Sequence, residues 1–193
     1  MSKRILGVAG FIFLIAECLL FILSWLLSAT MVDDVRSLLS SEGVRWFLGS
    51  YTSILASPLL AWLLLLLTAG GALSQCGVFS KHQGIRDRLA LRVSIVFIVI
   101  YLIIIALLTL TPHAILLSAT GNLFPSAFSR SLIPLIAFGI ILFSVTYGVM
   151  AGRLSSLSDV LDVLSYGIQK GAPLIVVYIL FIQFYESLWF VFG

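Results

Sequence analysis

The sequence predicts an all-α protein, a polytopic bundle of about five transmembrane helices in one integral membrane domain over residues 1–193. Hydrophobic residues make up 61% of the chain and charged residues 10%, whereas a soluble domain has about 25% charged residues. Nearly all charges lie between apolar stretches long enough to cross a bilayer, which takes about 20 residues. These stretches cover residues 5–30, 50–75, 91–112, 132–151 and 172–192. Because lipid offers no partners to backbone polar groups, each stretch is expected to be a helix.

The basic residues predict the orientation of these spans, because Lys and Arg are enriched in short cytoplasmic loops. With the amino terminus inside, most of the 11 basic residues are cytoplasmic: Lys3, Arg4, Lys81, Arg86, Arg88, Arg92, Arg153 and Lys170. The external ones are then Arg36, Arg45 and Arg130. We therefore expect a protein of the bacterial cytoplasmic (inner) membrane, N-in and C-out. The topology accounts for the positions of the basic residues, so the net charge of +3 does not indicate a nucleic-acid partner. The expected partner is the lipid bilayer.

The first span begins like a secretory signal, with Lys3 and Arg4 ahead of an apolar run over 5–27. That run is longer than the 7–15 residues of a signal-peptide core, which favours an uncleaved anchor over cleavage near 28–30. Cys18 lies in mid-span and Cys76 near the cytoplasmic end of the second span. At such different depths we expect no disulfide between them, and two cysteines are too few for a metal site. Both residues are predicted to serve packing.

The segment between the first two spans, residues 31–47, carries its apolar side chains mostly on one helical face. This predicts a short helix in the outer interface with Trp46 at headgroup depth; the alternative is a simple loop. The second apolar stretch is long and contains Pro58, which disfavours helix at Ser57. It is either one kinked helix or a short membrane-dipping segment (47–56) before the true span (58–75), and the second alternative is favoured. Gly70 and Gly71 permit close helix packing.

The connectors on the cytoplasmic side carry further structure. The connector 80–91 is basic, which fixes orientation or binds anionic lipid headgroups. The connector 153–170 predicts a helix with Ser158 as its N-cap, and with Asp159 and Asp162 favourably placed in its first turns.

Ionisable and polar side chains inside the apolar stretches are candidates for function, because they are costly in lipid. The candidates are Glu17 near the middle of the first span, Glu186 and Gln183 in the fifth, and His113 at the outer end of the third. A buried carboxyl can carry a proton through a transport cycle. The alternative is that a protonated Glu joins two helices structurally. No nucleophile–His–acid set, phosphate-binding loop or metal-ligand spacing is recognisable, so neither an enzyme nor a cofactor is predicted.

Two stretches resemble the p-aminobenzoyl-glutamate transporter (AbgT) family. The first, residues 38–46, reads LLSSEGVRW and is similar to that family's LLS-x-EG-(hydrophobic)-RW segment. It includes Glu42, Gly43, Arg45 and Trp46. The second begins PSAF at residue 125 and continues through SLIPLI, YG and SDV, ending with Gln183-Phe184. The resemblance implies a membrane transporter that forms homodimers and moves folate-related aromatic compounds with ion coupling.

The chain departs from this family in length, since family members are more than twice as long. A block with several spans and the first re-entrant hairpin has no counterpart between Val78 and Arg86. No substrate-path residue is therefore carried over. Two functions stay open. One is proton-coupled transport of small organic anions by a homo-oligomer, with a dimer favoured. The other is a non-transporting scaffold or accessory subunit, for which a larger membrane partner is the alternative to a homo-oligomer.

Overall fold

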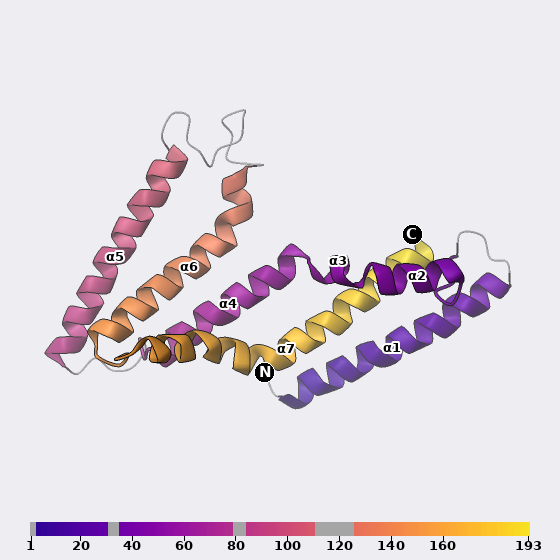
Figure 1. Ribbon diagram of the computed structural model, residues 1–193, viewed down its shortest axis with the longest axis horizontal. Coiled ribbons are helices and arrows are strands. Elements are labelled where there is room, and N and C mark those ends of the chain that lie inside the picture. The colour runs from indigo at the N-terminus through magenta and orange to yellow at the C-terminus, as the bar shows by residue number, and fades with distance from the viewer. Residues whose placement is uncertain (1–2, 31–34, 79–83, 111–125) are drawn as a thin grey trace. The chain divides into compact units, whose positions relative to one another are not determined.

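The computed structural model describes residues 3–30, 35–78, 84–110 and 126–193, and these residues form helices joined by short turns (Figure 1). The helices are α1 (Lys3–Ala29), α2 (Ser41–Gly49), α3 (Tyr51–Leu55), α4 (Pro58–Gln75), α5 (Ile85–Leu110), α6 (Ala127–Met150) and α7 (Leu157–Phe192). The described residues contain no strand. Among them, five helices, α1, α4, α5, α6 and α7, are long and apolar enough to cross a membrane. The predicted all-α fold is confirmed, with five helices long and apolar enough to span a membrane, while the topology of the spans stays a prediction.

The chain divides into two compact units. Unit 1 comprises Met1–Ala61 and Gly171–Gly193, and unit 2 comprises Trp62–Lys170. The sequence prediction was a single membrane domain, and it stays a prediction. Each unit has its own packing, and α7 passes from one to the other within a single helix.

In unit 1, α1 packs along the second half of α7, and the two run in the same direction (Figure 1). Gly10 lies beside Val177 and Leu180. Further along both helices, the ring of Phe13 meets that of Phe181 edge-on at 5.4 Å between centroids. Contacts at rising positions on both helices define a parallel pair. The residues of α1 in the seam recur at alternating spacings of three and four, as in coiled-coil packing: Gly10, Phe13, Glu17 and Leu20.

The segment before α4 covers another face of the same part of α7. The backbone N–H of Arg36 donates to the carbonyl of Val191 at 3.1 Å. The Trp46 ring stacks on Phe190 with centroids 4.4 Å apart. At the start of α4, the hydroxyls of Ser57 and Tyr178 are hydrogen-bonded. This segment therefore follows α7 for about three turns.

The helix break predicted at Pro58 is present, since α3 ends at Leu55 and α4 begins at Pro58. Proline is well tolerated at the first position of a helix, where its missing N–H has no intrahelical partner to bond. The favoured alternative is confirmed as far as the break is concerned, while the membrane depth of the preceding segment stays a prediction. In the preceding connector, the described helix α2 begins only at Ser41.

In unit 2, α4 and the first half of α7 cross with their backbones in contact. A Cβ atom added to Gly71 would overlap the backbone of Gly167, and one added to Gly167 would overlap the carbonyl of Leu67. Any larger residue at either position would separate the helices. Gly70, by contrast, has nothing within 4 Å of such an atom. The predicted close packing at the glycine pair thus belongs to Gly71 alone.

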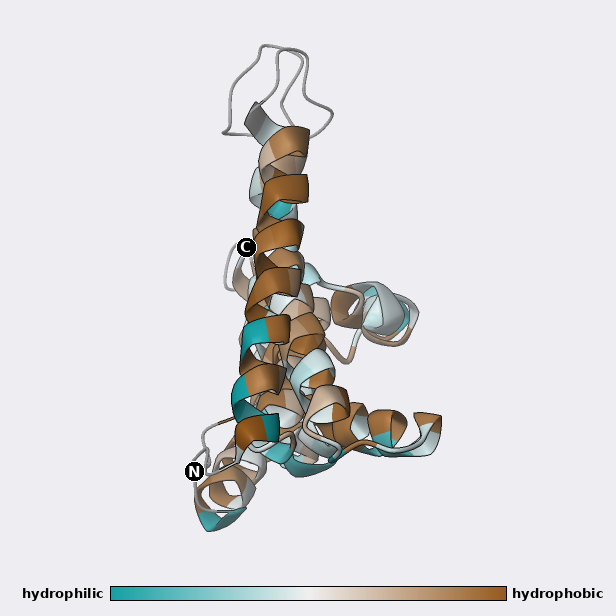
Figure 2. Cartoon of the chain, turned by 90° about the vertical axis from the view of Figure 1, so that its left-hand side faces the viewer, coloured by the Kyte–Doolittle hydropathy of each residue, from teal (hydrophilic) through white to brown (hydrophobic). Residues whose placement is uncertain are grey.

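The α5–α6 pair in unit 2 is also fitted around a glycine. A Cβ on Gly139 of α6 would lie 3.1 Å from the ring of Tyr101 on α5. The Tyr101 hydroxyl donates to the carbonyl of Leu135 at 2.9 Å. The bond satisfies the phenol, whose burial without a partner would be costly. Figure 2 shows α5, the helix nearest the viewer, hydrophobic over most of its length, with hydrophilic residues gathered at one end.

α7 is a single helix of 36 residues, about 54 Å long at 1.5 Å per residue and longer than a bilayer core of about 30 Å. We assign its apolar part, 172–192, to the span. Its first turns start at a different cap from the one expected. The N–H of Asp159 donates to Ser156 Oγ at 3.2 Å, and the N–H of Ser156 donates back to Asp159 Oδ2 at 2.9 Å. The N-cap is therefore Ser156, because only the residue three before Asp159 completes this reciprocal pair; the prediction of Ser158 was wrong.

Candidate functional site

A polar contact lies in the middle of the apolar seam of unit 1. The Ser187 hydroxyl on α7 donates to Glu17 Oε1 on α1 at 2.7 Å. Ser187 is fully buried and Glu17 is half-buried. The seam is apolar on both sides of this contact. Phe13 and Phe184 precede it along the two helices, and Leu20 and Val191 follow it. The carboxyl is thus held in a fixed place between two helices.

Gln183 lies on α7 one turn before Ser187 and is 94% buried, with 6% of its surface exposed. Neither its Oε1 nor its Nε2 has a hydrogen-bond partner among the described residues, and the same holds for Glu17 Oε2. Buried polar atoms are almost always hydrogen-bonded, so each exception calls for an explanation. Unit 1 therefore concentrates three unsatisfied polar atoms on two of the predicted site residues.

The structure does not bring Glu186 into this contact. Glu186 is half-buried. It lies eight residues after Tyr178 and four before Phe190 on α7, so the three side chains lie on one side of that helix. The other two side chains contact Ser57 and Trp46 rather than α1. Glu17 and Glu186 are thus associated with different faces of α7. His113, the remaining predicted candidate, lies outside the described residues.

The family-like motif has a clear local structure. The hydroxyl of Ser40 accepts from the N–H of Gly43 at 3.0 Å and caps α2. A Cβ at Gly43 would overlap the backbone of Leu38, so the turn before α2 requires a glycine there. Trp46 anchors α2 on α7 through Phe190, whereas Glu42 and Arg45 are exposed.

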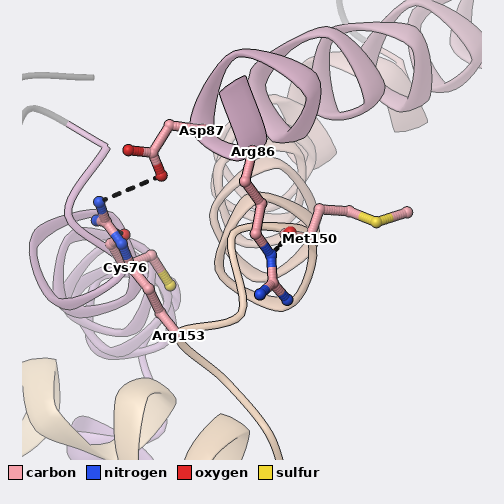
Figure 3. Close-up of polar contacts among 5 residues, drawn as sticks. All are labelled: Cys76, Arg86, Asp87, Met150 and Arg153. Atoms are coloured by element: carbon pink, nitrogen blue, oxygen red, sulfur yellow. Dashed lines mark hydrogen bonds and ion pairs between the residues drawn. The ribbon is translucent and has the colours of Figure 1, made fainter. Parts of the chain in front are cut away.

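A second polar cluster lies in unit 2, where α4 and α6 end and α5 begins (Figure 3). Arg153 Nη1 donates to the carbonyl of Cys76 at 2.6 Å, and Arg153 Nη2 lies 3.7 Å from Asp87 Oδ1. Arg86 Nε donates to the carbonyl of Met150 at 3.2 Å. Cys76 and Met150 carry carbonyls that a helix leaves without an internal partner at its end. The arginines cap two helices, and this explains them without a ligand.

The turn that positions Arg153 depends on Gly152, whose φ is +73°. The N–H of Arg153 donates to the carbonyl of Gly148 at 2.9 Å, and that of Gly152 to the carbonyl of Val149 at 3.0 Å. This is the Schellman arrangement, in which a left-handed glycine ends a helix. The same end of unit 2 buries Cys76, and this burial raises the pKa of its thiol while the charge of Arg153 opposes the rise. Cys76 lies in a buried apolar cluster, as predicted for a packing residue, whereas Cys18 is exposed on the surface of the chain, so the structure does not bury it as the same prediction required.

Asp159 caps the first turn of α7, ahead of the apolar part of that helix. Its Oδ2 accepts from the N–H and hydroxyl of Ser155, at 2.8 and 2.9 Å, and from the N–H of Ser156 at 2.9 Å. These bonds, with the one from Ser155 N–H contributing most, lower the pKa of Asp159 from 3.8 to about 2. The carboxylate has a structural task here rather than a catalytic one.

Unit 2 also has a groove of about 420 Å³, lined mainly by apolar side chains of α5 and α6. The one polar side chain in its lining is Tyr101, whose hydroxyl already donates a hydrogen bond to the carbonyl of Leu135. Such a groove suits a hydrocarbon chain and offers nothing to an organic anion. The polar contact of unit 1 therefore remains the better candidate for function.

Ser187 is the site residue that the sequence candidates omitted. Its signal in the sequence is its position four residues after Gln183, which places both residues near one side of a helix. Serine is common as a small packing residue in transmembrane helices, so its type alone does not mark it. The contact with Glu17 depends on the register between α1 and α7, which only the structure supplies.

Within the described residues, no group of three or more His, Cys, Asp or Glu side chains is placed to hold a metal ion. Comparison of the chain with protein-family models, curated proteins and solved structures finds no match.

Proposed function

We propose that this chain is a small integral protein of the bacterial cytoplasmic membrane, related to AbgT-type secondary transporters, that couples proton movement to the transport of small organic anions. The observation that carries the proposal is the contact between Glu17 and Ser187, with Gln183 one turn away, inside an apolar helix seam. An ionisable side chain at such a place is costly. Reversible binding of a proton would be a function for the Glu17 carboxyl that accounts for this cost.

The orientation proposed is N-in and C-out. It is supported by the excess of Lys and Arg in the segments assigned to the cytoplasm. The parallel run of α1 and the second half of α7 fits an odd number of crossings with the two ends on opposite sides, and the choice of N-in rests on the basic residues alone. Single cysteines at exposed positions test it, with a membrane-impermeant thiol reagent. Ser41→Cys should react in intact cells and Leu157→Cys only in inverted vesicles; the reverse pattern would refute the orientation.

A homo-oligomer, with a dimer favoured, is part of the proposal. Five helices are few to enclose a path for an organic anion, so a second copy is expected to complete it. Chemical cross-linking in native membranes, followed by mass measurement, tests this. A monomer at every cross-linker concentration would contradict it.

The decisive experiment is proton-driven uptake of aromatic acids, such as p-aminobenzoyl compounds, into liposomes that contain the purified protein. Glu17→Gln should abolish the flux, because an amide cannot release a proton, while it leaves an acceptor for Ser187. Glu42→Gln on exposed α2 is the matched control and should retain full flux. Retention of flux in Glu17→Gln would remove this carboxyl from transport.

The second candidate, a non-transporting scaffold or accessory subunit, is favoured by a specific observation. Glu17 is hydrogen-bonded across a helix interface, which is also how a purely structural carboxyl would be used. If this candidate is right, flux is absent for all acids tested at all pH values, and Glu17→Gln assembles like the wild type. A larger membrane partner would then copurify with both.

A further inference from the structure

The unsatisfied atoms of unit 1 belong to groups of complementary chemistry. Gln183 has one acceptor, Oε1, and one donor group, Nε2, both buried and without a partner among the described residues. Glu17 Oε2 is buried and unpartnered as well, while its Oε1 is occupied by Ser187. A carboxyl is a donor through its bound proton and an acceptor without it. A neutral amide carries both a donor and an acceptor, so it can bond either form of the carboxyl.

Gln183 and Glu17 lie about one helical turn apart along the seam of α1 and α7, and no hydrogen bond joins them in the structure. Gln183 precedes Ser187 by four residues, which is a rise of about 6 Å along α7. Ser187 touches Glu17, and Phe184, the neighbour of Gln183, packs against Phe13, one turn before Glu17 on α1. Gln183 thus lies at about the level of Phe13, roughly one helical turn before Glu17. Both side chains are long and can cover the remaining gap by a change of rotamer.

We propose that Gln183 is the hydrogen-bond partner of Glu17 Oε2 and that its amide serves the carboxyl in both protonation states. In the acid form the O–H of Oε2 donates to Gln183 Oε1. When the O–H bond breaks, the proton passes to a water molecule, and the carboxylate then accepts from Gln183 Nε2 after the amide turns over. Return of the proton from water reverses the step. Ser187 donates to Oε1 throughout and keeps the carboxyl in place.

The inference rests on the proposed function, because it gives the proton-binding step of that transporter its partner. The other ionisable side chains on α1 are Lys3, Arg4 and Cys18. Those on the second half of α7 and on the segment before α4 are Arg36, Glu42, Arg45, Tyr51, Tyr178, Tyr185 and Glu186. Within the described residues, the hydrogen bond that reaches the Glu17 carboxyl comes from Ser187 and from none of these. An amide partner has a further advantage over a charged one, since it adds no second charge to an apolar seam.

Infrared difference spectroscopy of the protein in lipid bilayers, without substrate, tests the bond directly. The spectrum of wild type minus Glu17→Gln isolates the C=O stretch of the protonated Glu17. Gln183→Met, which keeps the size of the side chain and removes its polar atoms, should shift that band. Ser187→Ala should shift it too. Gln169→Met on the exposed face of α7 is the matched control and should leave the band in place.

An unshifted band in Gln183→Met, with Ser187→Ala shifting as expected, would overturn the proposal. So would a difference spectrum with no protonated Glu17 band at any pH. If Gln183→Met does not fold, the wild-type protein with labelled glutamine amide and glutamate carboxyl groups gives a second measurement. Solid-state NMR should then show a through-space contact between the Gln183 amide nitrogen and the Glu17 carboxyl carbon, and its absence would refute the bond.

This result and the transport result can fail separately. A shifted band without flux would leave the hydrogen bond and remove the transport function. Flux with an unshifted band would keep transport and remove Gln183 from the proton site. In a working transporter, Gln183→Met should also alter the pH profile of flux, which Gln169→Met should not.

Discussion

The two units of this chain differ in how their polar groups are bonded. In unit 1 a carboxyl, a hydroxyl and an amide lie between apolar helices, and three of their atoms have no partner among the described residues. In unit 2 the charged groups of Arg86 and Arg153 bond carbonyls at helix ends. The close contacts of unit 2 instead involve glycines. The polar side chains of unit 2 have a structural role as helix caps, whereas no such role accounts for the polar side chains in the seam of unit 1.

This difference indicates where function is to be sought. A capped helix end satisfies groups that would otherwise need water, so it needs no further reason to exist. A carboxyl in the middle of a helix seam is different, because a leucine there would pack without any desolvation cost.

The largest effect is expected at the glycine crossing of unit 2. Gly71→Val should lower the free energy of unfolding by about 3 kcal/mol, because the new side chain would overlap the backbone of Gly167 and force α4 and α7 apart. Gly70→Val is the control on the same helix, with open space around its Cβ, and should stay within about 0.5 kcal/mol of wild type. Reversible unfolding in mixed detergent micelles measures both. Equal effects would show that the crossing is not a close one.

The next effect concerns the arginine that caps α4. Arg153→Gln should cost about 2 kcal/mol, since it removes a charged hydrogen bond to the carbonyl of Cys76. Asp87→Asn should cost under about 0.5 kcal/mol, because the ion pair at 3.7 Å is partly exposed. Arg92→Gln on the exposed face of α5 serves as the control. An Asp87 effect as large as that of Arg153 would make the ion pair, rather than the cap, the main bond.

A smaller effect is expected in unit 1. Ser187→Ala should destabilise the protein by about 1 kcal/mol, the usual range for a hydrogen bond between membrane helices, because Glu17 Oε1 loses its donor. Ser165→Ala, on the same helix in unit 2, removes only a local bond to the carbonyl of Asp162 and should be nearly neutral. The same unfolding measurement applies. A neutral Ser187→Ala would mean that the contact contributes nothing to holding α1 on α7.

The sequence predicted those features that depend on local chemistry. Five apolar stretches predicted five long helices, and Pro58 predicted the start of α4, because proline restricts the residues next to it whatever surrounds them. The cost of charge in lipid marked Glu17. What remained hidden depends on register between distant segments. Ser187 meets Glu17, and Gly71 rather than Gly70 meets Gly167, only because of how the helices are aligned.

The smallest effect is expected at the start of α7, where the acid is exposed and its bonds are local. The pKa of Asp159 is lowered to about 2 by hydrogen bonds from Ser155 and Ser156. Because this folded-state value lies below the ordinary 3.8, the stabilisation is complete above that pH and is lost as the pH falls toward 2. The NMR amide signals of Ser155 and Ser156 should therefore titrate together with a midpoint of about 2.

Asp159→Asn should abolish this titration, whereas Asp162→Asn, one turn further along α7, should leave it unchanged. A midpoint near the ordinary value in the wild type would show that the cap does not hold in solution. Retention of the titration in Asp159→Asn would assign it to another acid. Either result would show that the protonation of Asp159 is not linked to the cap of α7. The contrast between a structural acid at a helix end and the acid in the helix seam would then be weaker.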